Sequence, residues 1–195
     1  MAELNEDQRQ AVQDIGFGDI LDVGVRRMPS SLNYWLVENF HGIECEIRLP
    51  RHRSIVITPE EVRLTLGFPM GNREIPEERK ENDSPAFATW KAQYEGVRNN
   101  RIKPKDVIAS MLANTDGAGQ FKRDFMVVLV TYFMDFGTKN FVSLQYFDAL
   151  EDVGDIGQYN WCGFLLKCLV KHKRRYARAT GRTKMFGGPV FFLLV

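Results

Sequence analysis

The stretch from Gln120 to Arg175 constrains the fold most, because it contains the only segments apolar enough to form the centre of a domain. In its first part, apolar side chains recur three or four residues apart, as on one buried face of a helix. This face consists of Phe121, Phe125, Val128, Leu129, Tyr132 and Phe133. The last part carries a second apolar set, Trp161, Phe164, Leu165, Cys168 and Leu169. We therefore expect two long central helices joined by a shorter one.

A β-hairpin is expected over residues 43–57. Apolar and charged side chains alternate from Ile43 to Leu49, which is typical of a half-buried strand, and Ser54 to Ile57 supplies the returning strand. Directly afterwards, Thr58-Pro59-Glu60-Glu61 combines a capping box with proline at the first helical position. This tetrapeptide predicts the start of a helix.

The other segments favour helices, so the predicted fold is mainly α, a single helical domain with one β-hairpin. The 195 residues are enough for one hydrophobic core, and a hydrophobic content of 44% is ordinary for a globular protein. We expect one domain over residues 1–195. The polar stretch 71–84 is interpreted as a mobile surface loop within it.

Charge is unevenly distributed, although the net charge is only +1. Residues 171–184 carry seven cations and no acid: Lys171, Lys173, Arg174, Arg175, Arg178, Arg182 and Lys184. Such a segment can bind phosphates or act as a nuclear localisation signal. It can equally be a solvated helix end, where cations complement the helix dipole. The sequence leaves both interpretations open.

No pattern of residues indicates catalysis, a cofactor or a metal. The chain has no Gly-x-Ser-x-Gly, no His-Glu-x-x-His and only three histidines. Cys168 and His172 share a helix face, but a zinc site needs about four ligands and no Cys-x-x-Cys is present. Asp and Glu are abundant without any pair standing out, so an unrecognised carboxylate enzyme stays an alternative. We expect a non-enzymatic protein without a cofactor.

The chain ends in the apolar run Val190, Phe191, Phe192, Leu193, Leu194 and Val195. A terminal apolar segment usually docks on something, so we expect this run to contact a partner protein or a second copy of the chain. The acidic N-terminus has neither a signal-peptide nor a transit-peptide pattern, and no apolar run approaches about 20 residues. Three cysteines without framework spacing favour a reducing compartment. These features predict an intracellular protein without a membrane partner. The basic segment 171–184 favours the nucleus, with the cytoplasm as the alternative.

Several motifs, in this order, resemble the plant mobile domain family, also labelled aminotransferase-like. They are Ile15-Gly16-Phe17-Gly18, Trp35-Leu36-Val37-Glu38-Asn39-Phe40, Ile57-Thr58-Pro59-Glu60-Glu61-Val62, Leu66-Gly67-Phe68-Pro69-Met70-Gly71, Phe121-Lys122-Arg123, Leu150-Glu151-Asp152-Val153 and Tyr159-Asn160-Trp161-Cys162. The resemblance spans residues 15–195 and covers the N-terminal part of the family's longer domain. It therefore implies a domain shortened at its C-terminus.

The resemblance implies an interaction module. Members occur in plant transposable elements and in host proteins derived from them, and host members are linked to transposon silencing and to phosphatase-like partners in the nucleus. No catalytic residues are established for the family, so none is transferred to this chain. An aminotransferase needs a loop that cradles the phosphate of its cofactor, and the chain has no Gly/Ser-rich phosphate loop before a helix. The segment nearest to one is Gly117-Ala118-Gly119, which can also be a plain loop.

The function expected from the sequence is therefore a regulatory protein–protein interaction module related to transposon-derived plant proteins, with a host protein as partner. One alternative is a nucleic-acid-binding module that uses residues 171–184. Another is a toxin or antidote of a selfish genetic element that acts through a host protein.

Overall fold

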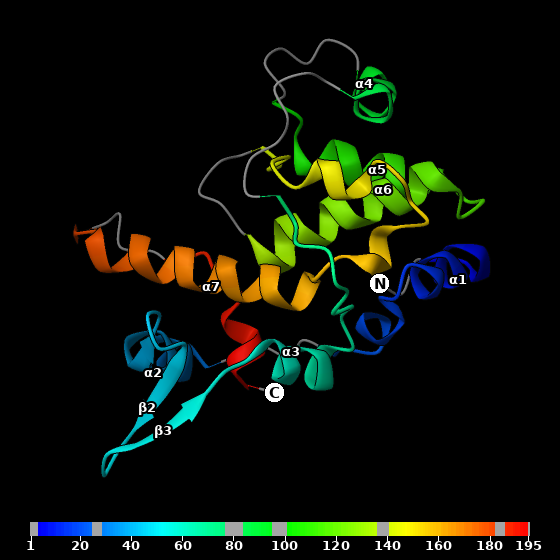
Figure 1. The fold of residues 1–195 in the computed structure, drawn as a ribbon. Coiled ribbons are helices and arrows are strands. Elements are labelled where there is room, and N and C mark those ends of the chain that lie inside the picture. Colours follow the sequence, from blue (N-terminus) through cyan, green and yellow to red (C-terminus); the bar gives the residue numbers. More distant parts are fainter. Residues whose placement is uncertain are drawn as a thin grey trace.

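The computed structural model describes residues 4–24, 29–76, 84–94, 101–135, 141–181 and 186–194. Within these ranges lie seven α-helices and one three-stranded antiparallel sheet, so the predicted mainly α fold is confirmed. Figure 1 shows α7 crossing the middle of the molecule, with α5 and α6 on one side and the sheet, α3 and the C-terminal turn on the other.

The α-helices are α1 (Glu6–Asp14), α2 (Ser30–Asn39), α3 (Pro59–Leu66), α4 (Pro85–Ala92), α5 (Pro104–Ala113), α6 (Gly119–Leu129) and α7 (Trp161–Arg178). The strands are β1 (Phe40–His41), β2 (Glu46–Leu49) and β3 (Arg53–Val56). Short 3-10 helices are η1 (Gly18–Leu21), η3 (Phe147–Leu150), η4 (Ile156–Gln158) and η6 (Val190–Leu194), while η2 (Val130–Met134) is π-helical.

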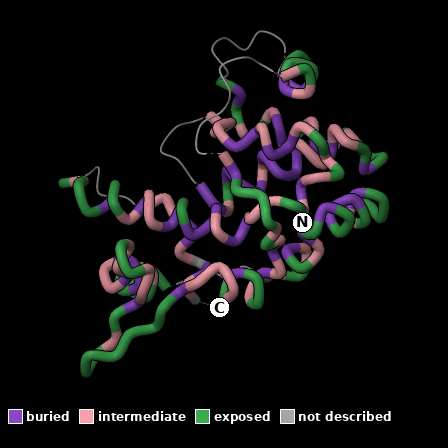
Figure 2. The backbone as a smooth tube through the Cα atoms, in the orientation of Figure 1, coloured by how far each residue is buried: buried purple, intermediate pink, exposed green. Residues whose placement is uncertain are grey.

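The central helices lie where the apolar period predicts them. Helix α6 buries Phe121 and Phe125, and α7 buries Trp161, Leu165 and Leu169. Figure 2 shows purple, buried backbone along both helices. Three details differ from the expectation. Helix α6 passes into the π-helical η2 at Val130, 3-10 turns occupy the expected joining helix, and Tyr132, predicted on the buried face, is 49% exposed.

The hairpin forms, but it is shorter than predicted. Strands β2 and β3 pair with Ile47 opposite Ile55, while Ile43 is 89% exposed and lies before the strand. Cys45 has a left-handed backbone with φ 51°, which interrupts the extended conformation that the alternating pattern suggests. Phe40 and His41 form the additional strand β1 against β2.

The capping box at the start of α3 is confirmed. The Glu61 carboxylate accepts a hydrogen bond from the Thr58 N–H at 2.9 Å, and Pro59 occupies the first turn. Gly67 ends the helix in a left-handed conformation with φ 64°, a backbone geometry that glycine adopts without a steric penalty.

The loop after α3 is attached to the start of α7. The Trp161 N–H donates to the Pro69 carbonyl at 3.0 Å, and the Gly71 N–H donates to the Tyr159 carbonyl at 3.2 Å. A Cβ on Gly71 would lie 2.0 Å from the Gln158 carbonyl oxygen, so this close approach requires glycine. Of the predicted mobile loop 71–84, residues 71–76 thus lie against the segment before α7, with Arg73 bridged to Tyr159. Ser84 caps α4, and residues 77–83 lie outside the described residues.

A buried carboxylate holds α4, α5 and α6 together. Asp124, which is 0% exposed, accepts hydrogen bonds from Trp90 Nε1 at 2.7 Å and from Ser110 Oγ at 2.6 Å. Tyr94 and Gln120 donate as well, both at 3.0 Å. Burial raises the pKa of Asp124, and the four donors oppose that rise. We interpret this carboxylate as structural, because three donors come from the packed helices and the fourth, Tyr94, lies two residues after α4.

Candidate functional site

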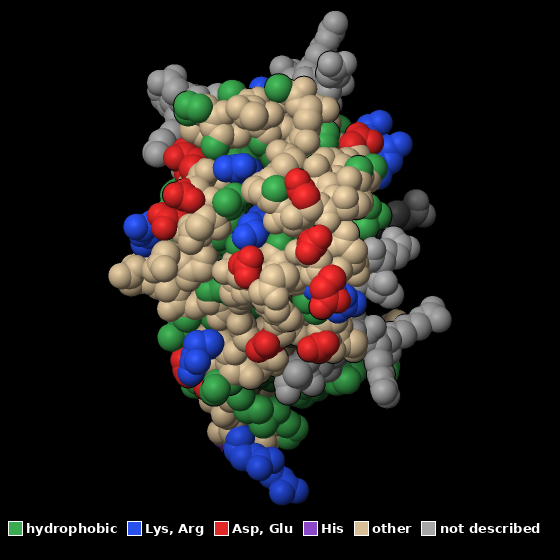
Figure 3. All heavy atoms as spheres, turned by 90° about the vertical axis from the view of Figure 1, so that its right-hand side faces the viewer, with side chains coloured by type: hydrophobic (Ala, Val, Ile, Leu, Met, Phe, Trp, Pro, Cys, Tyr) green, Lys and Arg blue, Asp and Glu red, His purple; other side chains and the backbone are tan. Residues whose placement is uncertain are grey.

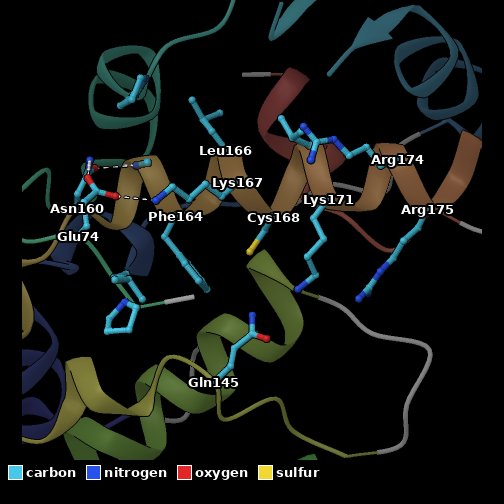
Figure 4. Close-up of a pocket in the computed structure, with 15 residues that line it drawn as sticks. Glu74, Gln145, Asn160, Phe164, Leu166, Lys167, Cys168, Lys171, Arg174 and Arg175 are labelled. Carbon is cyan, nitrogen blue, oxygen red and sulfur yellow. Dashed lines mark hydrogen bonds and ion pairs between the residues drawn. The ribbon is translucent and has the colours of Figure 1, made fainter. Parts of the chain in front are cut away.

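A groove of about 750 Å³ runs along α7 (Figure 4). The segment Glu74–Pro76, Gln145 and Pro59 at the start of α3 form the walls facing α7. Its apolar lining includes Ile75, Phe164, Leu166 and Val170. Its cationic lining consists of Lys167, Lys171, Arg174 and Arg175. The groove thus combines apolar surface with positive charge, and its volume lies in the range of ligand-binding clefts.

By their backbone positions the cations of α7 follow one face of the helix, although their side chains leave it in different directions. Lys167, Lys171, Arg174, Arg175 and Arg178 follow each other at intervals of four, three, one and three residues, which places them within an arc of about 100°. At about 1.5 Å per residue, this cationic face is about 16 Å long. In Figure 4, Lys171 and Arg175 point to one side of α7 with Phe164 and Cys168, while Arg174 points to the other side.

Lys171 is engaged by a buried carboxylate. Asp135, which is 7% exposed, lies 2.6 Å from Lys171 Nζ and 2.6 Å from His172 Nε2. Because a carboxylate only accepts, Nε2 carries the proton in this contact. Burial alone raises the pKa of Asp135, but the hydrogen bonds from His172 and Lys171 outweigh burial and lower it to about 2. This ion cluster therefore anchors the start of the basic segment to η2.

Lys173 is engaged at the other side of the helix. Its ammonium group donates to the Val37 carbonyl and, at 3.3 Å, to the Glu38 carbonyl, so it caps the last turn of α2. Tyr176 donates to the Glu38 carboxylate at 2.7 Å. Lys171 and Lys173 thus have structural roles, which leaves them less available to a partner.

Arg174, Arg175 and Arg178 are exposed, and none makes an ion pair within the described part of the chain. Arg182 and Lys184, the last two cations of the predicted segment, lie outside the described residues. Only the middle of that segment therefore presents free positive charge in the described structure.

The acid that lines the groove is already paired. Glu74 accepts a hydrogen bond from Lys167 Nζ at 2.7 Å and another from Asn160 Nδ2 at 2.9 Å. Since Lys167 offsets the charge of Glu74, Arg174 and Arg175 supply the excess positive charge of the groove.

Cys168 lines the groove but lacks the properties of a nucleophile. It is 2% exposed, and burial raises the pKa of its thiol to about 12, so the reactive thiolate is scarce near neutral pH. His172, four residues later, is directed to Asp135. Among the described residues, no group of three or more metal-binding side chains comes together.

The glycine-rich loop before α6 is occupied by the chain itself, since the Ala118 N–H donates to the Asp116 carboxylate at 3.0 Å. That acid fills the position that an external anion would take at this helix start.

The C-terminal apolar run packs on the molecule where it is described. Phe192 is 5% exposed, and Val190 and Leu193 are half-buried against the core. Helix η6 contacts α2 and α3. The side chains of Phe191 and Leu194, and all of Val195, lie outside the described structure. A partner contact of this run stays a prediction, but the described side chains are mostly covered by their own chain.

Asp135 and Glu74 are the residues that the sequence did not single out. Their partners lie 36 and 93 residues away, so no local spacing connects them with α7. The basic segment itself was visible in the sequence, but which of its cations stay free was not.

The described chain contains no helix with the length and apolar character needed to cross a membrane. A family model with the description "Domain of unknown function (DUF8566)" matches residues 1–194. No curated protein and no solved structure matches the chain.

The resemblance to the plant mobile domain family is therefore wrong, because the family that matches almost the whole chain is a different one. The residues that suggested it have a structural role that explains them without that family. Pro69 and Gly71 hold Tyr159 and Trp161 at the start of α7. The transposon and phosphatase associations, which rested on the resemblance, are withdrawn with it.

Proposed function

We propose that this chain, which belongs to the family described as domain of unknown function DUF8566, is a non-enzymatic interaction module. It binds an acidic segment of a partner protein in the groove along α7.

The observation that supports this proposal is the free positive charge in the groove. Arg174 and Arg175 line it, are exposed and have no acidic partner within the described ranges, whereas Glu74 is paired with Lys167. A ligand that supplies carboxylates to the two arginines gains charge-assisted hydrogen bonds. A guanidinium group can donate two parallel N–H···O hydrogen bonds to one carboxylate.

The apolar lining favours a protein segment over a bare anion. Leu166, Val170 and Ile75 line the groove. Ile75 and Leu166 are 4% and 7% exposed, so the half-buried Val170 offers most of this apolar surface. A segment with alternating acidic and apolar side chains satisfies both parts of the lining. The cationic face, about 16 Å long, matches about five residues of an extended chain.

A nucleic acid is the second candidate, and Arg178 favours it because this residue extends the cationic face beyond the groove. Two observations favour a protein segment instead. Phe164, the aromatic residue of the groove lining, is 6% exposed and offers little area for stacking on bases. Apolar side chains between the cations contribute nothing to phosphate contacts.

The test measures the affinity of a short fluorescein-labelled peptide of alternating Glu and Leu by fluorescence anisotropy. The test variant is Arg174→Glu/Arg175→Glu. The matched control is Lys103→Glu/Lys105→Glu, which makes the same change of net charge at exposed positions near the start of α5. We expect the arginine variant to bind at least about tenfold more weakly, and the lysine control to bind within about threefold of the wild type.

Equal losses in both variants would mean that net charge alone attracts the peptide, which would refute the groove as the binding site. A labelled single-stranded DNA is measured in parallel at about 50 mM and about 200 mM salt. If the DNA binds more tightly than the peptide and depends on the same arginines, the nucleic-acid function replaces the one proposed.

A further inference from the structure

The sheet offers a second surface, distinct from the groove. We propose that the outer edge of β3 accepts an extended segment of a partner protein as a fourth strand, and that this segment places acidic side chains beside the hairpin turn.

The outer edge of β3 is open. The strand order is β1-β2-β3, so β3 ends the sheet, and all four of its residues are exposed. Within the described structure, its extensive contacts are with β2. Figure 1 shows the hairpin projecting from the rest of the molecule, and Figure 2 shows it exposed along most of its length.

The backbone of β3 presents hydrogen-bonding groups to this edge. The Ile57 N–H donates to the Cys45 carbonyl at 2.8 Å, and Ile47 lies opposite Ile55 in the same ladder. In an antiparallel pair every second residue is hydrogen-bonded to the neighbouring strand. Because Ile57 is bonded, Ile55 and Arg53 are bonded to β2 as well. Ser54 and Val56 therefore direct their N–H and C=O groups outward. An added strand satisfies these groups.

Apolar side chains lie on the strand itself, since Ile55 is 52% exposed and Val56 is 55% exposed. Nine large hydrophobic side chains are exposed in the described chain, and seven of them lie between residues 32 and 64. They are Leu32, Tyr34, Trp35, Ile43, Ile55, Val56 and Leu64. Figure 3 shows hydrophobic side chains gathered at the lower end of the molecule, next to the Lys and Arg side chains of its tip. A concentration of this kind is typical of a protein interaction site.

The charges at the hairpin tip select an acidic partner. Arg48 is paired with Glu46 at 2.8 Å, but Arg51 and Arg53 make no ion pair among the described residues. Arg51 also has a left-handed backbone, with φ 64°, although glycine or asparagine adopts this conformation at lower cost. The turn therefore places an arginine at a position where its backbone conformation is unfavourable. A second copy of the chain would bring further cations to this edge, so a partner with acidic side chains fits it better.

The strand also defines the pattern of its partner. Arg53 and Ile55 point to one face of the sheet, and Ser54 and Val56 point to the other. In an antiparallel partner strand, apolar residues lie opposite Val56 and Ile55, and acids lie opposite Arg53 and beside Arg51. The matching order is Val-Ile-Thr-Glu-Ser-Glu.

The test titrates the full-length chain with the peptide Thr-Val-Ile-Thr-Glu-Ser-Glu-Thr and follows backbone amides by NMR. The test variant is Val56→Pro, which removes an outward N–H while the N–H of Ile55 still bonds to β2. The control is Val56→Thr, which keeps the N–H and suits a strand. The wild type and the control should bind alike, with the Ser54 amide exchanging about tenfold more slowly when peptide is bound. The proline variant should bind at least about tenfold more weakly.

Two further variants make the outcome decisive. Arg174→Glu/Arg175→Glu should bind this peptide like the wild type, which separates the β3 edge from the groove of the proposed function. Arg51→Glu/Arg53→Glu keeps the whole backbone and should lose binding by at least about tenfold, so the test does not depend on the folding of the proline variant.

Unchanged affinity in both the Val56→Pro and the Arg51→Glu/Arg53→Glu variants would overturn the proposal. So would amide shifts confined to α7. A concentration-dependent dimer of the chain alone that disappears in Val56→Pro would show that the edge pairs with a second copy, which would overturn the acidic partner.

Discussion

Replacing Asp135 by asparagine removes the buried charge that joins η2 to α7. The carboxylate receives hydrogen bonds from Lys171 and His172, both at 2.6 Å, and its pKa falls from 3.8 to about 2. A carboxyl group whose pKa is lower in the folded than in the unfolded protein stabilises the fold at pH values above its unfolded-state pKa. This stabilisation is lost as the pH falls through the folded-state pKa. At neutral pH the shift corresponds to about 2 kcal/mol.

The same pKa shift also predicts how the difference in stability changes with pH. At about pH 3, Asp135 is mostly protonated in the unfolded state, and the linkage relation leaves about 1 kcal/mol of its contribution. The free energy of unfolding should therefore differ between the wild type and Asp135→Asn by about 2 kcal/mol at about pH 7 and by about half as much at about pH 3.

Urea titrations followed by tryptophan fluorescence measure these differences across the pH range. Asp22→Asn is the matched control, because Asp22 is exposed, and it should change stability by less than about 0.5 kcal/mol. A difference between wild type and Asp135→Asn that stays constant from about pH 3 to about pH 7, or one below about 0.5 kcal/mol at about pH 7, would refute the assignment of a stabilising buried carboxylate.

Three other substitutions test the packing, each by thermal or urea unfolding. Asp124→Ala leaves four hydrogen-bond donors without their acceptor and should cost about 3–5 kcal/mol; a loss below about 1 kcal/mol would contradict the network. Gly71→Ala places a Cβ 2.0 Å from the Gln158 carbonyl oxygen and should cost about 2 kcal/mol or more, and an unchanged melting temperature would show that the loop can move away. The buried Tyr146 hydroxyl meets no partner at hydrogen-bonding geometry in the described chain, so Tyr146→Phe should leave stability unchanged or raise it by up to about 1 kcal/mol, whereas a clear loss would reveal a missing contact.

Local patterns in the sequence predicted the elements that depend on local physics. The capping box from Thr58 to Glu61 and the apolar period of α6 and α7 are complete within a few residues, so they were readable without the structure. The alternation from Ile43 to Leu49 predicted the hairpin but not its start, because the left-handed backbone of Cys45 leaves no trace in the polarity pattern.

The candidate site was only half predictable, because its charges are sorted by distant partners. The sequence showed a run of cations. It did not show that Lys171 forms an ion pair with Asp135 or that Lys173 donates a hydrogen bond to the end of α2. Arg174 and Arg175 line the groove, and neither meets an acidic partner among the described residues. The open edge of β3 was equally hidden, since strand order follows from tertiary packing and not from the hairpin residues themselves.

The central claim, an acidic segment bound along α7, is tested most directly by hydrogen–deuterium exchange of the full chain with a saturating peptide of alternating Glu and Leu. The account predicts slower exchange in α7 around Lys167 to Arg175 and in the facing segment Glu74–Pro76, with no such change in Arg174→Glu/Arg175→Glu. Protection that appears only elsewhere, or that persists in the variant, would contradict it.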